Sequence, residues 1–176
     1  MRKIVLTYGL MAGALMSAMM LLTVQFHDQI GFGAAGYLVG YASMALAFLL
    51  VFAGVKAYRD QVAGGTVTFG RAFKAGILIT VIASACYVAT WQVVYHKLMP
   101  DFLHKYAAHA QEEARKSGAT EAQIAEKNWQ MAEFKVMYQN PLVNIAFTFL
   151  EPLPVGLLFT LAAAGVLRRK RPVAAP

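Results

Sequence analysis

The stretch LVNIAFTFLEPLPVGLLFTLAAAGVL, residues 142–167, decides the fold class. Its only ionisable side chain is that of Glu151. A bilayer core about 30 Å thick is crossed by roughly 20 consecutive apolar residues in a helix. Because lipid offers no hydrogen-bonding partners to a free backbone, such a segment must be helical. The stretch therefore predicts a transmembrane helix.

Three further apolar stretches, residues 4–26, 37–55 and 76–95, contain no charged residue. The whole chain of 176 residues is 59% hydrophobic and 14% charged, beyond the roughly 45–50% apolar content of soluble domains. The first stretch follows MRK, as in a signal peptide, but its apolar run exceeds the usual 7–15 residues or so, and we expect it to be retained. The sequence predicts an all-α membrane protein, a single domain over residues 1–176 with four spans that contact lipid.

Residues 97–140, between the third and fourth spans, predict a helical hairpin outside the cytoplasm. Thr120 and Gln123 form a capping-box pattern at the start of its second helix. Apolar residues recur on one side of each helix: Met99, Phe102, Leu103, Tyr106 and Ala110 in the first, and Ile124, Met131, Phe134 and Tyr138 in the second. These faces are expected to pack together or on the bilayer surface, and a protein partner is the alternative.

The basic residues predict the orientation of the chain in the membrane. One side holds ten basic residues against a single acidic one, Asp60: Arg2, Lys3, Lys56, Arg59, Arg71, Lys74, Arg168, Arg169, Lys170 and Arg171. The other side holds six basic and seven acidic residues. Both termini are therefore expected in the cytoplasm. Because the basic residues flank the apolar stretches rather than forming one stripe, a nucleic-acid partner is not expected.

Each span carries small residues four positions apart, which let helices approach closely in lipid. They are Gly9, Gly13 and Ser17; Gly36 and Gly40; Gly76, Thr80 and Ser84; and Gly156, Thr160 and Ala164. Packing within one four-helix bundle explains them, and a homodimer interface on one of these ladders is the alternative.

The sequence offers no recognisable catalytic or metal-binding motif. It lacks HExxH, GxSxG and P-loop patterns, and the single Cys86 allows no disulfide within the chain. His109, Glu112 and Glu113 share a helix face, but such a charged face is ordinarily a solvated surface. We therefore expect no enzyme, no metal and no cofactor.

Glu151 is the unusual residue of the fourth span. No Lys or Arg lies in any span at its depth, so desolvation favours the neutral acid. Pro152 and Pro154 cannot donate, which leaves helix carbonyls without partners. A neutral carboxyl group bonded to Tyr87 or Ser84 repairs part of that deficit. Alternatively, a broken helix with a carboxylate is how transporters hold an ion or proton.

A second group of candidate residues flanks the second and third spans on the basic side. It consists of Tyr58, Arg59 and Asp60, followed by Thr68, Phe69, Gly70, Arg71 and Lys74. Thr68 is expected to cap a short helix whose basic residues meet anionic headgroups. Anchoring of the helix ends explains the group, and a lipid-binding or regulatory site is the alternative.

These pieces, YRD…GG.VTFGRAFKAG with MPDF…KY and E.LPVGLL, resemble the domain-of-unknown-function 4199 family of small bacterial membrane proteins. The resemblance runs from about Gly9 to Arg169, and Pro152 is a departure from it. It implies a bacterial inner-membrane location with four spans and supplies no catalytic residues. We expect a non-enzymatic membrane scaffold, sensor or accessory protein that acts through the hairpin; the alternative is a proton- or cation-coupled transporter that uses Glu151.

Overall fold

The computed structural model describes residues 1–168, and every element in this range is helical. The elements are α1 (Arg2–Gln25), α2 (His27–Ile30), α3 (Ala34–Gln61), α4 (Phe69–Val93), the π-helical turn η1 (Val94–Leu98), α5 (Phe102–Lys116), α6 (Glu121–Tyr138), α7 (Pro141–Leu150) and α8 (Leu153–Leu167). Arg169, Lys170 and Arg171, which contribute to the predicted charge asymmetry, lie outside the described residues.

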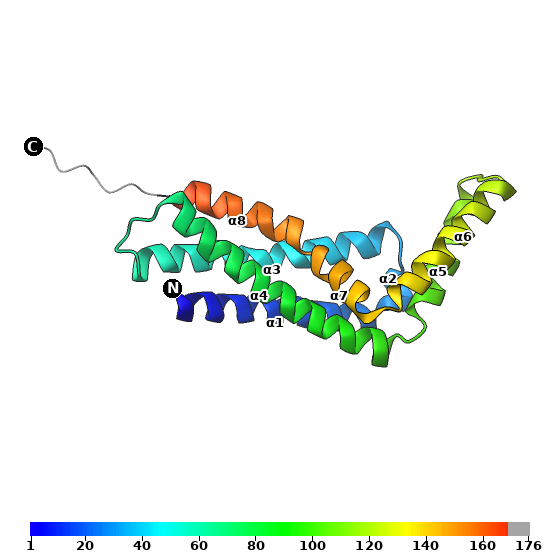
Figure 1. Ribbon diagram of the computed structural model, residues 1–176, viewed down its shortest axis with the longest axis horizontal. Coiled ribbons are helices and arrows are strands. Elements are labelled where there is room, and N and C mark those ends of the chain that lie inside the picture. The colour runs from blue at the N-terminus through cyan, green and yellow to red at the C-terminus, as the bar shows by residue number, and fades with distance from the viewer. Residues whose placement is uncertain (169–176) are drawn as a thin grey trace, which may run out of the picture.

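Four of these segments are long and apolar enough to cross a membrane: α1, α3, α4 with η1, and α7 with α8. They run side by side as a bundle (Figure 1). The predicted all-α class is confirmed, and each of the four predicted spans corresponds to a helical segment that is long and apolar enough to cross a membrane. Two spans are longer than their apolar runs, since α3 continues to Gln61 and α4 already begins at Phe69.

The extension of α4 corrects one expectation. Thr68 does cap a helix, accepting a hydrogen bond from the Arg71 backbone at 3.5 Å, but the helix is not short. It continues without interruption into the third span, because no proline follows Thr68 before the span ends. The preceding turn is made by Gly64 and Gly65, whose positive φ angles of 65° and 80° suit glycine.

Small residues allow the close helix contacts of the bundle. A Cβ atom at Gly13 of α1 would lie 2.6 Å from the Cβ of Cys86 on α4, and one at Gly76 would lie 2.9 Å from the Thr160 side chain on α8. Gly156 of α8 similarly meets Phe48 and Thr80. The ladders of α1, α4 and α8 therefore face neighbouring helices of the same chain, whereas a Cβ at Gly40 of α3 would meet no atom within 4 Å.

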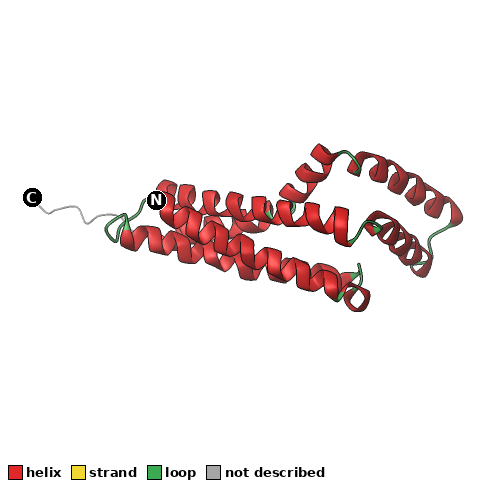
Figure 2. Cartoon of the chain, turned by 90° about the horizontal axis from the view of Figure 1, so that it is seen from below, coloured by secondary structure: helices red, strands yellow, loops and turns green. Residues whose placement is uncertain are grey.

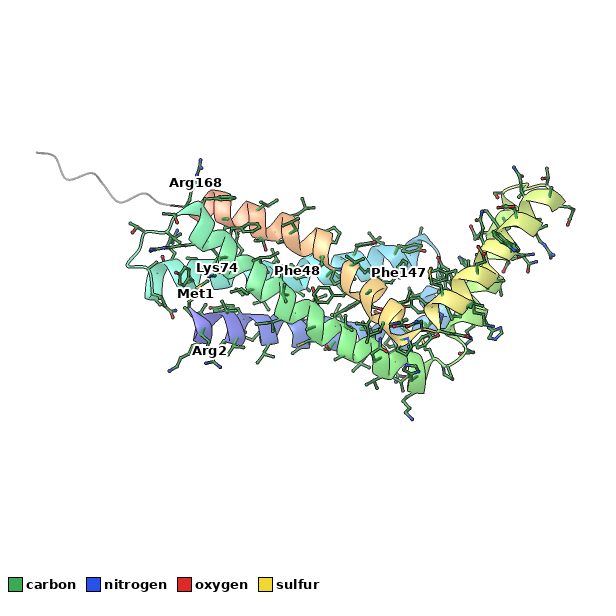
Figure 3. All side chains as sticks on the ribbon, in the orientation of Figure 1. Met1, Arg2, Phe48, Lys74, Phe147 and Arg168 are labelled. Atoms are coloured by element: carbon green, nitrogen blue, oxygen red, sulfur yellow. The ribbon has the colours of Figure 1, made fainter. Side chains whose placement is uncertain are left out.

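The helices α5 and α6 lie beyond the end of the bundle that is opposite Met1 and Arg168 (Figures 1 and 3). They are two distinct helices joined by a loop (Figure 2). The capping box predicted at Thr120 and Gln123 is confirmed, with both hydrogen bonds present at 3.3 and 2.9 Å. Phe102 and Tyr106 of α5 pack against Phe32 after α2, which fixes α5 on the end of the bundle.

Candidate functional site

The fourth span is interrupted where the sequence places its two prolines. Helix α7 ends at Leu150 and α8 begins at Leu153, so Glu151 and Pro152 form the junction. Proline lacks an N–H and its ring clashes with the preceding helical turn, which accounts for the break. Pro152 is buried between helices, whereas Pro154 is exposed in the first turn of α8.

Glu151 receives a hydrogen bond from α4. The Tyr87 hydroxyl donates to its Oε2 atom at 3.0 Å. Within residues 1–168 no ion pair involves Glu151. The side chain lies at the surface of the bundle rather than enclosed between its helices. Tyr87 therefore ties the interrupted fourth span to the third one through a polar contact.

Ser84 is the other residue that the sequence proposed as a partner of Glu151. It is fully buried on α4, about one turn from Tyr87. Its hydroxyl makes no hydrogen bond among the described residues, and it is not brought to the carboxyl group. Of the two candidate partners, the fold places only Tyr87 at the break.

Further polar contacts join α4 to the chain around α7. The Gln92 side chain donates to Oδ1 of Asn144 at 2.7 Å, and the Trp91 indole donates to the Tyr138 hydroxyl at 3.0 Å. Together with the Tyr87–Glu151 bond, these contacts form what we term the polar seam. Asn144 is only 2% exposed, and its Nδ2 atom has no partner in the part of the chain that the structure describes.

Sequence reasoning missed Gln92 and Asn144. A signal was present, because Asn144, Thr148 and Glu151 are four and three positions apart and therefore lie on one helix face. Thr148 is also buried, and its hydroxyl donates to the Asn144 carbonyl at 2.8 Å. The partner on α4 was not readable, since Gln92 is 52 residues away along the chain.

The second group of candidate residues lies apart from the polar seam. Arg59 and Asp60 pair at 2.6 Å near the end of α3, with Tyr58 buried beside them. Thr68 caps α4, where Phe69 and Phe73 stack with ring centroids 6.1 Å apart. Gly70, Arg71 and Lys74 are exposed. Figure 3 shows Lys74 at the same end of the molecule as Met1 and Arg168, with Phe147 of α7 well along the bundle from them.

The charged face of α5 carries ion pairs. Glu112 meets Lys116 at 2.8 Å, and this contact lowers the pKa of the Glu112 carboxyl group. His109 lies against the ring of Phe32, with ring centroids 6.0 Å apart. His109 and Glu112 thus have neighbours of their own within the protein.

Comparison with known proteins gives one result. No curated protein and no solved structure matches the chain. Residues 7–169 match the family described as "Protein of unknown function (DUF4199)". Because this match covers nearly the whole sequence, including both groups of candidate residues, the chain belongs to the DUF4199 family.

Proposed function

We propose that this protein is a non-enzymatic protein of the bacterial inner membrane that binds a protein partner through helix α6. In this proposal both termini lie in the cytoplasm, and α5 and α6 lie on the other side of the membrane. The protein then acts as a scaffold, sensor or accessory subunit for that partner.

The observation that carries the proposal is the exposed apolar surface of α6. Trp129, Val136 and Met137 are 59%, 72% and 44% exposed, although α6 is outside the four apolar spans. Trp129 and Val136 are seven positions apart and therefore share a helix face. Exposed Trp is characteristic of the centre of protein interfaces, and exposed apolar clusters mark contact surfaces.

Site-specific photocrosslinking in cells tests this proposal. A benzophenone side chain replaces Trp129 or Val136 in the full chain, and Lys127, exposed on the opposite side of α6, serves as the control position. We expect one discrete crosslinked protein from Trp129 and Val136 and none from Lys127. Trp129→Ser in the Val136 probe protein should reduce the yield at least several-fold.

Two results would contradict the partner hypothesis. Crosslinks exclusively to lipid would place the α6 surface on the bilayer. Equal crosslinking from Lys127 would show that the apolar side of α6 has no preference for a partner.

The transporter alternative is supported by the polar seam. An interrupted helix with a carboxyl group at the break is the arrangement that secondary transporters use for coupling ions. Against it, membrane carboxylates that move ions usually face the bundle interior or an aqueous cavity, whereas Glu151 lies at the bundle surface.

Proton flux distinguishes the two functions. The purified protein is placed in liposomes that enclose a pH-sensitive dye. After a membrane potential is imposed, the dye signal should change no faster in these liposomes than in liposomes without protein. A flux above this background that Glu151→Gln abolishes and Pro154→Ala retains would instead establish the transporter.

A further inference from the structure

A cavity of about 230 Å³ lies between α1, α3 and α4 at the end of the bundle that α5 covers. Five of the nine methionines of the chain line it: Met16, Met19, Met20, Met44 and Met99. Six residues with phenyl, phenol or indole rings also line it: Phe32, Tyr37, Tyr87, Trp91, Phe102 and Tyr106. Tyr87 and Trp91 also belong to the polar seam, but neither the seam nor the α6 surface accounts for the five methionines and the other four aromatic residues.

The charge of the wall restricts the ligand. Among the described residues that line the cavity there is no Lys, Arg, Asp or Glu, and the one imidazole is that of His27. A charged molecule would lose its hydration there without gaining a counter-ion, at a large cost in free energy. The ligand must therefore be neutral.

Most of the polar groups in the wall are already engaged. Thr23 and Ser43 donate to carbonyls of their own helices at 2.8 and 2.7 Å, Tyr87 donates to Glu151, and Trp91 donates to Tyr138. Donors with remaining capacity are the ring of His27 and, at the α5 end, the hydroxyl groups of Tyr37 and Tyr106, which lie 3.5 Å apart. One of the two hydroxyl protons forms the hydrogen bond between the tyrosines, and the other can be donated to a ligand.

This tyrosine pair is suited to donate to a ligand. The hydrogen bond with Tyr37, together with burial, raises the pKa of Tyr106 to about 12, so this phenol keeps its proton to a higher pH than a free tyrosine does. Tyr37 is 55% exposed and stands at the edge of the cavity. An oxygen atom on the ligand would find a donor at this position.

Size and wall composition favour a ring over a long chain. A dry apolar cavity of about 150 Å³ accommodates benzene, so 230 Å³ accommodates one ring with small substituents. Aromatic rings gain specific edge-to-face contacts with one another, and methionine sulfur makes favourable contacts with ring edges. The wall itself shows this geometry, since Trp91 meets Phe102 edge-on at 4.9 Å.

We propose that this cavity binds a neutral, lipid-soluble molecule with a flat, oxygen-bearing ring, the chemistry of a quinone or a substituted phenol. The ring lies between the methionine and aromatic side chains, and its oxygen accepts a hydrogen bond from the Tyr37–Tyr106 pair. This binding does not depend on a partner at α6.

The two tryptophans of the chain allow a direct test. Trp91 lines the cavity and Trp129 is exposed on α6, so Trp129→Phe leaves Trp91 as the single tryptophan, which can be excited selectively over the tyrosines. Duroquinone is the probe, because its fully methylated ring has no open position for addition of the Cys86 thiol. With purified full-length protein, we expect duroquinone to quench Trp91 fluorescence saturably.

Gly40 provides a matched pair of variants. It lines the cavity, and a Cβ there would meet no atom within 4 Å, so the side chain of Gly40→Leu has room to extend into the site and narrow it. Gly165 of α8 is equally open but lies away from the cavity. We expect Gly40→Leu to weaken duroquinone binding at least tenfold and Gly165→Leu to leave it unchanged, with equal helical content by circular dichroism.

Three outcomes would overturn the assignment. Quenching that rises linearly with duroquinone concentration, and equally in Gly40→Leu and Gly165→Leu, would show that duroquinone only partitions into detergent or lipid. Displacement of duroquinone by decanol as readily as by a methylated phenol would assign the cavity to alkyl chains. Unchanged affinity in the double variant Tyr37→Phe/Tyr106→Phe, which removes both hydroxyl groups, keeps the shape of the wall and also serves if Gly40→Leu does not fold, would remove the proposed hydrogen bond.

Discussion

At the scale of single residues, Glu151 and Tyr87 show how a polar group is accommodated in an apolar span. The proline junction frees helix carbonyls, and a carboxyl group stands beside them with one hydrogen bond from α4. A neutral carboxyl group avoids the cost of a charge in lipid. It also has an O–H group that can donate a hydrogen bond to a free carbonyl.

Substitutions at Glu151 should separate shape from charge. Glu151→Gln preserves an acceptor for Tyr87, so the free energy of unfolding should change by less than roughly 1 kcal/mol, as for most hydrogen bonds in membranes. Glu151→Lys should cost about 2.5–3.5 kcal/mol, because a cation is placed in the span. Reversible unfolding in bicelles measures the free energy of unfolding of both variants. Tyr87→Phe is the control that removes the hydrogen-bond donor and leaves Glu151 in place.

Infrared spectroscopy on the same proteins reports the protonation of Glu151. The band of a neutral carboxyl group should be present near pH 7 and absent from the Gln variant. An ionised group at that pH, or a Gln variant as unstable as the Lys variant, would contradict a structural role and favour the transporter.

At the scale of helices, the contact between α8 and α4 depends on one missing side chain. A Cβ at Gly156 would lie 2.9 Å from Cζ of Phe48 and would also collide with Thr80 Cγ2. The Thr80 and Thr160 hydroxyl groups, 3.1 Å apart, form a hydrogen bond in the same contact. Glycine is therefore needed there for close approach rather than for a special backbone angle.

Gly156→Ala should force α8 away from its neighbours and cost about 1–3 kcal/mol, the range for overpacked cores. Gly165→Ala on the same helix, where a Cβ meets nothing within 4 Å, should not destabilise the protein and should gain up to about 1 kcal/mol from the better helix propensity of alanine. Unfolding of the two variants side by side checks the difference. Equal stabilities would mean that α8 does not pack as closely as the structure describes.

At the scale of the whole molecule, the fold separates two chemically different ends. Met1, Arg2, Lys74 and Arg168 gather at one end, and α5 and α6 lie at the other (Figures 1 and 3). The positive-inside rule predicts that the basic end lies in the cytoplasm.

Reporter fusions test this orientation. A reporter that is active only outside the cytoplasm should be active after Ser117, in the α5–α6 loop, and silent after Gly64 or after Pro176. The physical reason is the excess of basic residues around the Gly64 loop and the termini. Activity after Gly64 would reverse the predicted topology.

The sequence by itself determined the features that depend on one segment. An apolar run of about 20 residues specifies a span whatever its neighbours are, so four spans could be predicted. Thr120 and Gln123 cap α6 because the side chain of each accepts a hydrogen bond from the backbone N–H of the other, and the break at Pro152 follows from the missing N–H of proline. Helix ends were less predictable, because α3 and α4 extend through polar residues until a turn stops them.

Only the tertiary structure decided which segments meet. The Gln92–Asn144 and Thr80–Thr160 bonds join residues 52 and 80 positions apart, and no local pattern specifies such a partner. The cavity is likewise absent from any single segment, since its methionines come from α1, α3 and the turn before α5. Side-chain packing selects one arrangement of the four spans, and that arrangement creates the polar seam and the cavity.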